Sequence, residues 1–180
     1  MFRPVIISLL ALIILAFEAN AGESADHCKD ALPKNLQGAI AAKYNGWRVV
    51  HDGDLSTDDL KIWKRLFPNH CPGVVKAAFE KSGTPQYAVL LNSKAEKKTV
   101  LLVAKETKLG NFRLIKIDEF TRGNSPVIHA GKPGTYFNIS DRSKAIKVPR
   151  PTIVLEVLEA SAVAYFYNGT RFQSVVISDG

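Results

Sequence analysis

The sequence predicts an α+β fold in which two short N-terminal helices pack on an antiparallel β meander of about eight or nine strands. Three observations predict this fold. Apolar residues recur at helical spacing near residues 33–46 and 57–67. From Val74 onward, short apolar runs alternate with turn residues at intervals of roughly 10–14 residues. The links between these runs have hairpin length, which leaves no room for crossover helices and favours antiparallel pairing of neighbouring strands.

The first 21 residues, MFRPVIISLLALIILAFEANA, have the layout of a secretory signal peptide. Arg3 precedes an apolar run over residues 5–17, and Ala19-Asn20-Ala21 supplies the small-residue cleavage site. The alternative is an uncleaved membrane anchor, but the run of thirteen residues is shorter than the 18 or more that suggest a spanning helix. We therefore expect residues 22–180 to form a single periplasmic or secreted α+β domain with no transmembrane segment.

The mature chain keeps two cysteines, Cys28 and Cys71. In an oxidising compartment, an even pair with no other partner predicts a disulfide. The alternative is a zinc site that would also use the neighbouring His27 and His70.

The first predicted helix begins at Pro33, which suits a first helical turn, and carries Leu36, Ile40 and Tyr44 at a spacing of four. Residues 45–46, Asn-Gly, supply its C-terminal stop.

The segment WRVVH at 47–51 predicts a strand, and the turn-forming HDGD leads from it to the second helix. Ser56 is the expected N-cap, with Asp59 at the third helical position as in a capping box. The apolar stripe of this helix consists of Leu60, Trp63, Leu66 and Phe67.

The β region contains nine predicted strands. They span residues 74–79, 87–92, 99–106, 112–120, 127–131, 135–140, 152–159, 162–168 and 172–178. The basic segment DRSKAIKVPRP, between the sixth and seventh of them, is interpreted as a solvated loop or a guarded sheet edge.

The stretch Ala78–Leu91 resembles the repeat turn of the FG-GAP/VCBS family, whose usual form is close to DFDGDGKPDYAVL. Here AFEKSGTPQYAVL keeps the turn-forming residues, but the four acidic positions hold Ala78, Glu80, Ser82 and Gln86. Calcium requires six to eight oxygen ligands, many of them carboxylates. The sequence therefore predicts a turn that has kept its shape and binds no metal, and no cofactor is expected.

More broadly, the chain resembles a group of small exported bacterial proteins of unassigned function. The shared pattern runs from GWRVV at 46–50 through CPG at 71–73 and YAVLL at 87–91 to YNG at 167–169. This resemblance supplies no mechanism.

The sequence predicts no enzyme. The histidines lack the spacing of a zinc-protease helix, no nucleophile elbow is present, and both cysteines are assigned to the disulfide. Glu156 and Glu159 are three apart in a predicted strand, so they are expected on opposite faces. The acids at 52–59 are expected to cap the second helix and complement its dipole.

The formal net charge of +7 favours a protein partner or an anionic envelope component, and nucleic acid is not expected in this compartment. Oligomeric state stays open. The expected function is a periplasmic non-enzymatic binding protein, in one version an inhibitor or immunity-type protein. The alternatives are a small enzyme or ligand carrier with a pocket between helices and sheet, and a structural envelope protein. The predicted partner-binding residues lie at two hairpin tips: Lys81, Ser82 and Thr84, and Lys94, Lys97 and Lys98.

Overall fold

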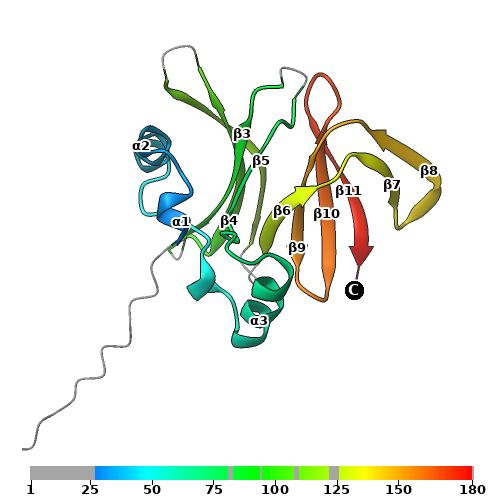
Figure 1. Ribbon diagram of the computed structural model, residues 1–180, viewed down its shortest axis with the longest axis horizontal. Coiled ribbons are helices and arrows are strands. Elements are labelled where there is room, and N and C mark those ends of the chain that lie inside the picture. The colour runs from blue at the N-terminus through cyan, green and yellow to red at the C-terminus, as the bar shows by residue number, and fades with distance from the viewer. Residues whose placement is uncertain (1–26, 81–82, 94, 108–109, 122–125, 180) are drawn as a thin grey trace, which may run out of the picture.

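The chain folds mainly into antiparallel β-structure arranged in layers. The computed structural model describes residues 27–80, 83–93, 95–107, 110–121 and 126–179. Within them lie eleven strands in three sheets and two ten-residue helices. Figure 1 shows the order of the layers: helix α2, a first sheet, a second sheet and a separate hairpin.

The first sheet is a meander of β3, β4 and β5, and two shorter strands, β1 and β2, pair with different parts of β3. Almost every residue of β3 and β4 is buried, because α2 covers one face of this sheet and the second sheet covers the other. Their near-continuous apolar sequences follow from burial on both faces. The strands are β1 (Arg48–Val49), β2 (Val74–Ala77), β3 (Gln86–Ser93), β4 (Lys98–Glu106) and β5 (Phe112–Thr121).

The second sheet has the strand order β11-β10-β9-β6, so β6 pairs with β9 although two strands intervene in the chain. The intervening strands form a two-stranded sheet of their own. The second sheet contains β6 (Val127–Gly131), β9 (Thr152–Val157), β10 (Ser161–Tyr167) and β11 (Phe172–Asp179). The hairpin contains β7 (Gly134–Asn138) and β8 (Asp141–Val148).

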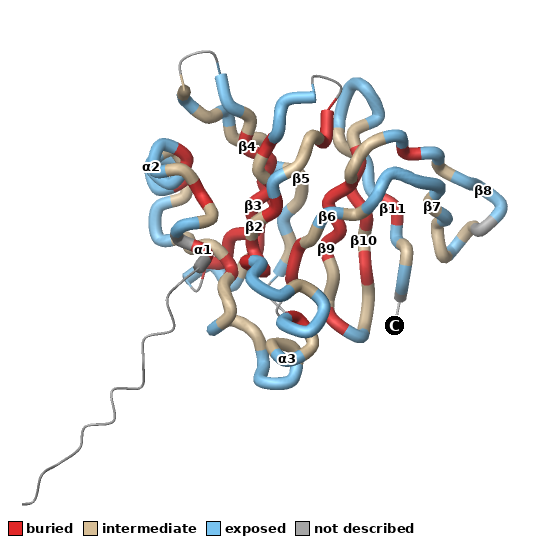
Figure 2. Tube along the Cα trace, viewed as in Figure 1, coloured by how far each residue is buried: buried red, intermediate tan, exposed pale blue. Residues whose placement is uncertain are grey.

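The main core lies between the two large sheets. Phe79, Leu90, Leu101 and Ile153 are fully buried there, and in Figure 2 the buried positions concentrate along the strands of these two sheets.

A polar contact links β5 and β10 across this core. The Tyr165 hydroxyl donates to the Asp118 carboxylate at 2.5 Å. Burial raises the pKa of the Tyr165 phenol well above its usual range, and the hydrogen bond and charge of Asp118 add to the shift.

The two longer helices pack on different parts of the β-structure. Helix α2 (Lys34–Lys43) buries Leu36 and Ile40 against the outer face of the first sheet. Helix α3 (Thr57–Leu66) is capped by Ser56, whose hydroxyl accepts from the Asp59 N–H at 3.1 Å, and it buries Trp63. The short helix α1 (His27–Asp30) and the 3₁₀ turn η1 (Asp52–Asp54) precede them.

The predicted fold of two N-terminal helices on one antiparallel meander is wrong. The structure is mostly β, and its strands divide among three separate sheets. The helices do not both precede the strands, because β1 lies between α2 and α3. The segment interpreted as a basic loop, DRSKAIKV, is the strand β8, in which the exposed Lys147 lies between Ile146 and Val148.

The predicted signal peptide lies outside the described residues. Within the described ranges, every helix is too short or too polar to cross a membrane.

Candidate functional site

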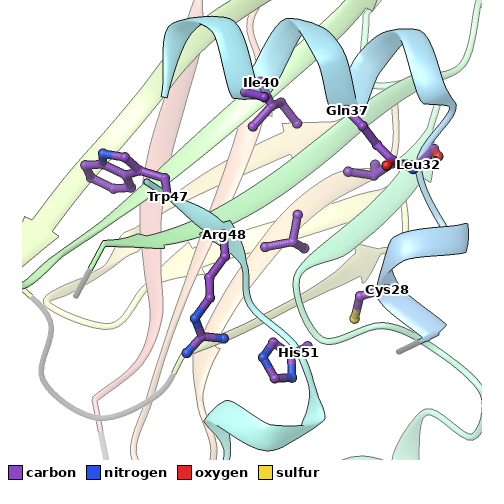
Figure 3. A pocket seen from close by; sticks show the side chains of 9 residues that line it. Cys28, Leu32, Gln37, Ile40, Trp47, Arg48 and His51 are labelled. Atoms are coloured by element: carbon purple, nitrogen blue, oxygen red, sulfur yellow. Dashed lines mark hydrogen bonds between the residues drawn. The ribbon is translucent and has the colours of Figure 1, made fainter. Parts of the chain in front are cut away.

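A cavity of about 380 Å³ lies between helix α2 and the edge strand β1. Figure 3 shows Ile40, Gln37 and Leu32 on the helical side of the cavity, and Arg48 and His51 on the segment that begins with β1, with the Arg48 guanidinium directed away from α2. The lining residues are Cys28, Leu32, Gln37, Ile40, Ala41, Trp47, Arg48, Val49 and His51.

The walls of this cavity are mainly apolar. Leu32 and Ile40 are buried, and Trp47 and Val49 are partly buried. Ile40 and Ala41 belong to the helix face that also carries Gln37, because residues three and four apart on a helix are neighbours. The volume equals that of about a dozen water molecules at roughly 30 Å³ each, which suits a small organic ligand.

Arg48 is fixed at the rim of the cavity by Asp54. Its two terminal nitrogens donate to the two carboxylate oxygens of Asp54, one of them at 2.7 Å. The Asp54 side chain is 1% exposed, whereas that of Arg48 is 35% exposed. This two-point contact uses two of the five N–H donors of a guanidinium. The remaining donors are held in a fixed orientation, and no other described residue accepts from them.

His51 continues this polar rim. Its ring Nδ1 accepts from the Gly53 N–H at 3.1 Å, and the backbone N–H of His51 donates to Asp54 Oδ2 at 3.2 Å. Because Nδ1 accepts, the neutral ring carries its proton on Nε2. That nitrogen lies 3.7 Å from Asp54 Oδ2. Asp54 therefore orders both side chains at the mouth of the cavity.

The lining of this cavity offers non-covalent contacts only. No hydroxyl or thiol nucleophile lies among the described lining residues, since Cys28 is bonded to Cys71. The cavity has an apolar wall on one side and hydrogen-bond donors on the other. Within the described ranges, no group of three or more His, Cys, Asp or Glu side chains is placed to hold a metal ion.

The predicted disulfide is confirmed: Cys28 and Cys71 are joined at an S–S distance of 2.02 Å, with their Cα atoms 5.0 Å apart. Both residues are buried. Two sulfurs bonded to each other are not free to ligate zinc. The crosslink also forms part of the cavity wall through Cys28.

The structure separates the two predicted partner-binding tips. Thr84 precedes β3 and Lys97 follows it, so they lie at opposite ends of an eight-residue strand, about 26 Å apart at the usual rise per residue. Both are exposed.

Lys98, by contrast, donates to Glu119 Oε1 at 2.7 Å. This hydrogen bond, together with the charge of Glu119, raises the pKa of Lys98. The remaining predicted residues, Lys81, Ser82 and Lys94, lie outside the described residues.

Two of the described ligand positions of the FG-GAP-like turn, Glu80 and Gln86, are occupied by another contact or buried. The Glu80 carboxylate accepts from the Lys105 ammonium. Gln86 is 1% exposed, and neither its amide nitrogen nor its amide oxygen has a hydrogen-bond partner among the described residues. Ser82 lies outside the described residues.

The other acids singled out in the sequence serve local structure. Asp52 pairs with Lys64 at 3.2 Å and Asp58 with Lys61 at 3.1 Å, while Asp59 accepts from the Ser56 hydroxyl at 2.8 Å. Glu156 Oε2 lies 3.2 Å from His129 Nε2, and the His129 ring stacks on Phe67. Glu159 is outside the strand, in the turn before β10, with a φ of 59°.

Sequence reasoning missed Arg48 and Asp54 as partners. A signal was present, because an arginine inside the strand-like WRVVH requires a partner, and the aspartates of HDGD follow within six residues. No protein-family model, curated protein or solved structure matches the chain. The FG-GAP-like resemblance therefore stays a prediction.

Proposed function

We propose that the protein is a non-enzymatic binding protein that holds a small amphipathic ligand between α2 and β1. The observation that carries this proposal is the combination of a mainly apolar cavity of about 380 Å³ with an arginine anchored at its rim. The apolar body of the ligand would lie against Ile40 and Leu32. Its carboxylate, or another acceptor, would meet the donors of Arg48 that Asp54 leaves unused.

A periplasmic or secreted location is part of the proposal. It is supported by the predicted signal peptide and by the Cys28–Cys71 disulfide, a bond typical of oxidising compartments.

The inhibitor or immunity-type version of the binding hypothesis has weaker support. It would use the hairpin tips, and of their described residues Lys98 already has an acidic partner in Glu119. The ligand-carrier version draws on a cavity with both apolar walls and oriented donors.

Isothermal titration with octanoate and 1-octanol tests this function. Octanoate should bind saturably and more tightly than 1-octanol, because the charged carboxylate forms stronger hydrogen bonds with the Arg48 guanidinium than a neutral hydroxyl does. Ala41→Phe should weaken octanoate binding at least about tenfold, since the added ring occupies the cavity that Ala41 lines.

Ala42→Phe is the matched control, because Ala42 is a neighbouring exposed alanine of α2 that does not line the cavity. Saturable binding that Ala41→Phe leaves intact, equal losses in both variants, or no binding of either compound would contradict the proposal.

A further inference from the structure

A second cavity, the inter-sheet cleft, opens between the two large sheets at the end where β4 finishes and β5 begins. Its volume is about 410 Å³. The turn between β10 and β11, at the top of Figure 1, forms its other side. The lining residues are Glu80, Lys105, Arg113, Ile115, Lys116, Ile117, Tyr167, Thr170, Arg171 and Phe172.

The inter-sheet cleft carries an excess of positive charge. Glu80 is the one acid among its described lining residues, and its carboxylate already bonds to Lys105. Lys116 bonds to Glu119 at 3.0 Å, which is not a lining residue. Arg113 and Arg171, by contrast, are exposed and have no acidic partner among the described residues. Two guanidinium groups thus remain to bind an anion.

Both arginines stand on ordered backbone. Arg113 pairs with Lys105 in the β4–β5 ladder. Arg171 closes the β10–β11 turn, where its N–H donates to the Asn168 side-chain oxygen at 3.0 Å and its carbonyl accepts from the Asn168 N–H at 3.0 Å. The two cations therefore reach the inter-sheet cleft from opposite sheets, Arg113 from a paired strand and Arg171 from a hydrogen-bonded turn.

An apolar wall lies next to these cations. Tyr167 and Phe172 pair directly across the β10–β11 ladder, with ring centroids 5.5 Å apart. Ile115 and Ile117 of β5 line the cleft as well. A simple hydrated ion would leave this wall in contact with water, whereas a ligand that carries an apolar group would cover it.

The buried amide of Gln86 lies close to the inter-sheet cleft. Tyr87 pairs with Ala104, so the preceding Gln86 stands beside Lys105 in the same ladder. Along β3, the Gln86 side chain lies on the opposite face of the sheet from Tyr87 and on the same face as Ala88, which packs in the inter-sheet core. Its two polar side-chain atoms have no hydrogen-bond partner within the described ranges, and they lie at the end of the core that the cleft reaches. Buried polar groups without partners are uncommon, and a polar ligand atom that reached this amide would remove the deficit.

We propose that the inter-sheet cleft binds a small organic phosphate monoester. The phosphate would be held between Arg113 and Arg171, because guanidinium forks match phosphate oxygens in geometry and charge. The organic group would lie against Phe172 and Ile115. This site goes beyond the proposed function, since it uses different residues and selects a different ligand charge.

Titration calorimetry with phenyl phosphate, inorganic phosphate and benzyl alcohol tests this proposal. Phenyl phosphate should bind saturably and more tightly than either of the other two compounds, and its affinity should fall as NaCl is raised. Arg113→Gln/Arg171→Gln should weaken phenyl phosphate binding at least about tenfold.

The control Arg65→Gln/Lys147→Gln removes the same charge from two exposed cations that do not line the cleft, and should change affinity less than about twofold. All four positions are exposed, so both variants should fold, which thermal melts verify.

Three results would overturn the proposal: no saturable binding of phenyl phosphate, equal losses in both double variants, or inorganic phosphate binding as tightly as phenyl phosphate. A fourth arm separates a free phosphate from a lipid headgroup. Flotation with phosphatidylcholine vesicles that contain phosphatidic acid should show no enrichment of the protein. Binding to these vesicles without binding to phenyl phosphate would also refute the proposal.

Discussion

Removal of the Cys28–Cys71 crosslink should destabilise the protein substantially. The cysteines are 43 positions apart, and the crosslink encloses α2, β1, η1 and α3. On the chain-entropy model, closing a loop of this length contributes about 4 kcal/mol to the free energy of unfolding. A chain of this size loses about 2–4 °C of Tm per kcal/mol. Cys28→Ala/Cys71→Ala should therefore melt about 8–16 °C below the wild type.

Far-UV circular dichroism during heating, with and without a reducing agent, measures this difference. The reducing agent should lower the Tm of the wild type and leave that of the double variant unchanged. Octanoate affinity should fall with stability, because every residue that lines the α2–β1 cavity lies within the enclosed loop, from Cys28 to His51. A double variant that melts within about 2 °C of the wild type would refute the claim that the crosslink limits the freedom of this loop.

Two other predictions concern single positions. Gly73→Ala should lower the free energy of unfolding, measured by urea denaturation, by about 1–3 kcal/mol, because a Cβ there would lie 2.4 Å from the Val50 carbonyl oxygen. Gly134→Ala is the control, since a Cβ at that position would meet open space, and an equal loss of stability in both variants would contradict this reason. The folded-state pKa of Tyr165 is raised above its ordinary value of 10.0, so the contribution of this phenol to stability is complete below pH 10 and is lost as pH rises further. In urea denaturation at pH 8 to 11, the free energy of unfolding should therefore fall more steeply with pH for the wild type than for Tyr165→Phe. Parallel curves for the two proteins would contradict this prediction.

Much of the local structure could be predicted from the sequence. The repeat of Leu36, Ile40 and Tyr44 gave the first helix, and the Ser56 hydroxyl caps the second as expected. The hairpins β3–β4–β5 and β9–β10–β11 followed from short links between apolar runs. These features depend on interactions between residues close in the chain.

The division into sheets could not be predicted, because it depends on pairing between distant segments. Nothing local in Val127–Gly131 indicates that it pairs with Thr152–Val157 and not with the preceding strand. The β8 strand was missed for a different reason. Its three basic residues were interpreted as part of a loop, although the alternation of Ile146, Lys147 and Val148 is typical of a strand that covers one face of a sheet.

The α2–β1 cavity depended on distant contacts in the same way. The buried Asp54 was read as part of a helix-capping group, yet its carboxylate holds Arg48, and only the folded chain places both beside α2.

The two proposed sites are held in place by different parts of the molecule. The cavity beside α2 lies within the disulfide loop, whereas the described residues around the inter-sheet cleft all follow Cys71 and are positioned by strand pairing. Loosening the loop can therefore empty the first site while the ladders that carry Arg113 and Arg171 stay paired. A loss of octanoate binding that left phenyl phosphate binding intact would show that the sheets fold independently of the crosslink. A loss of both would mean that the covering layer of α2 is needed to hold β4 and β5 in register.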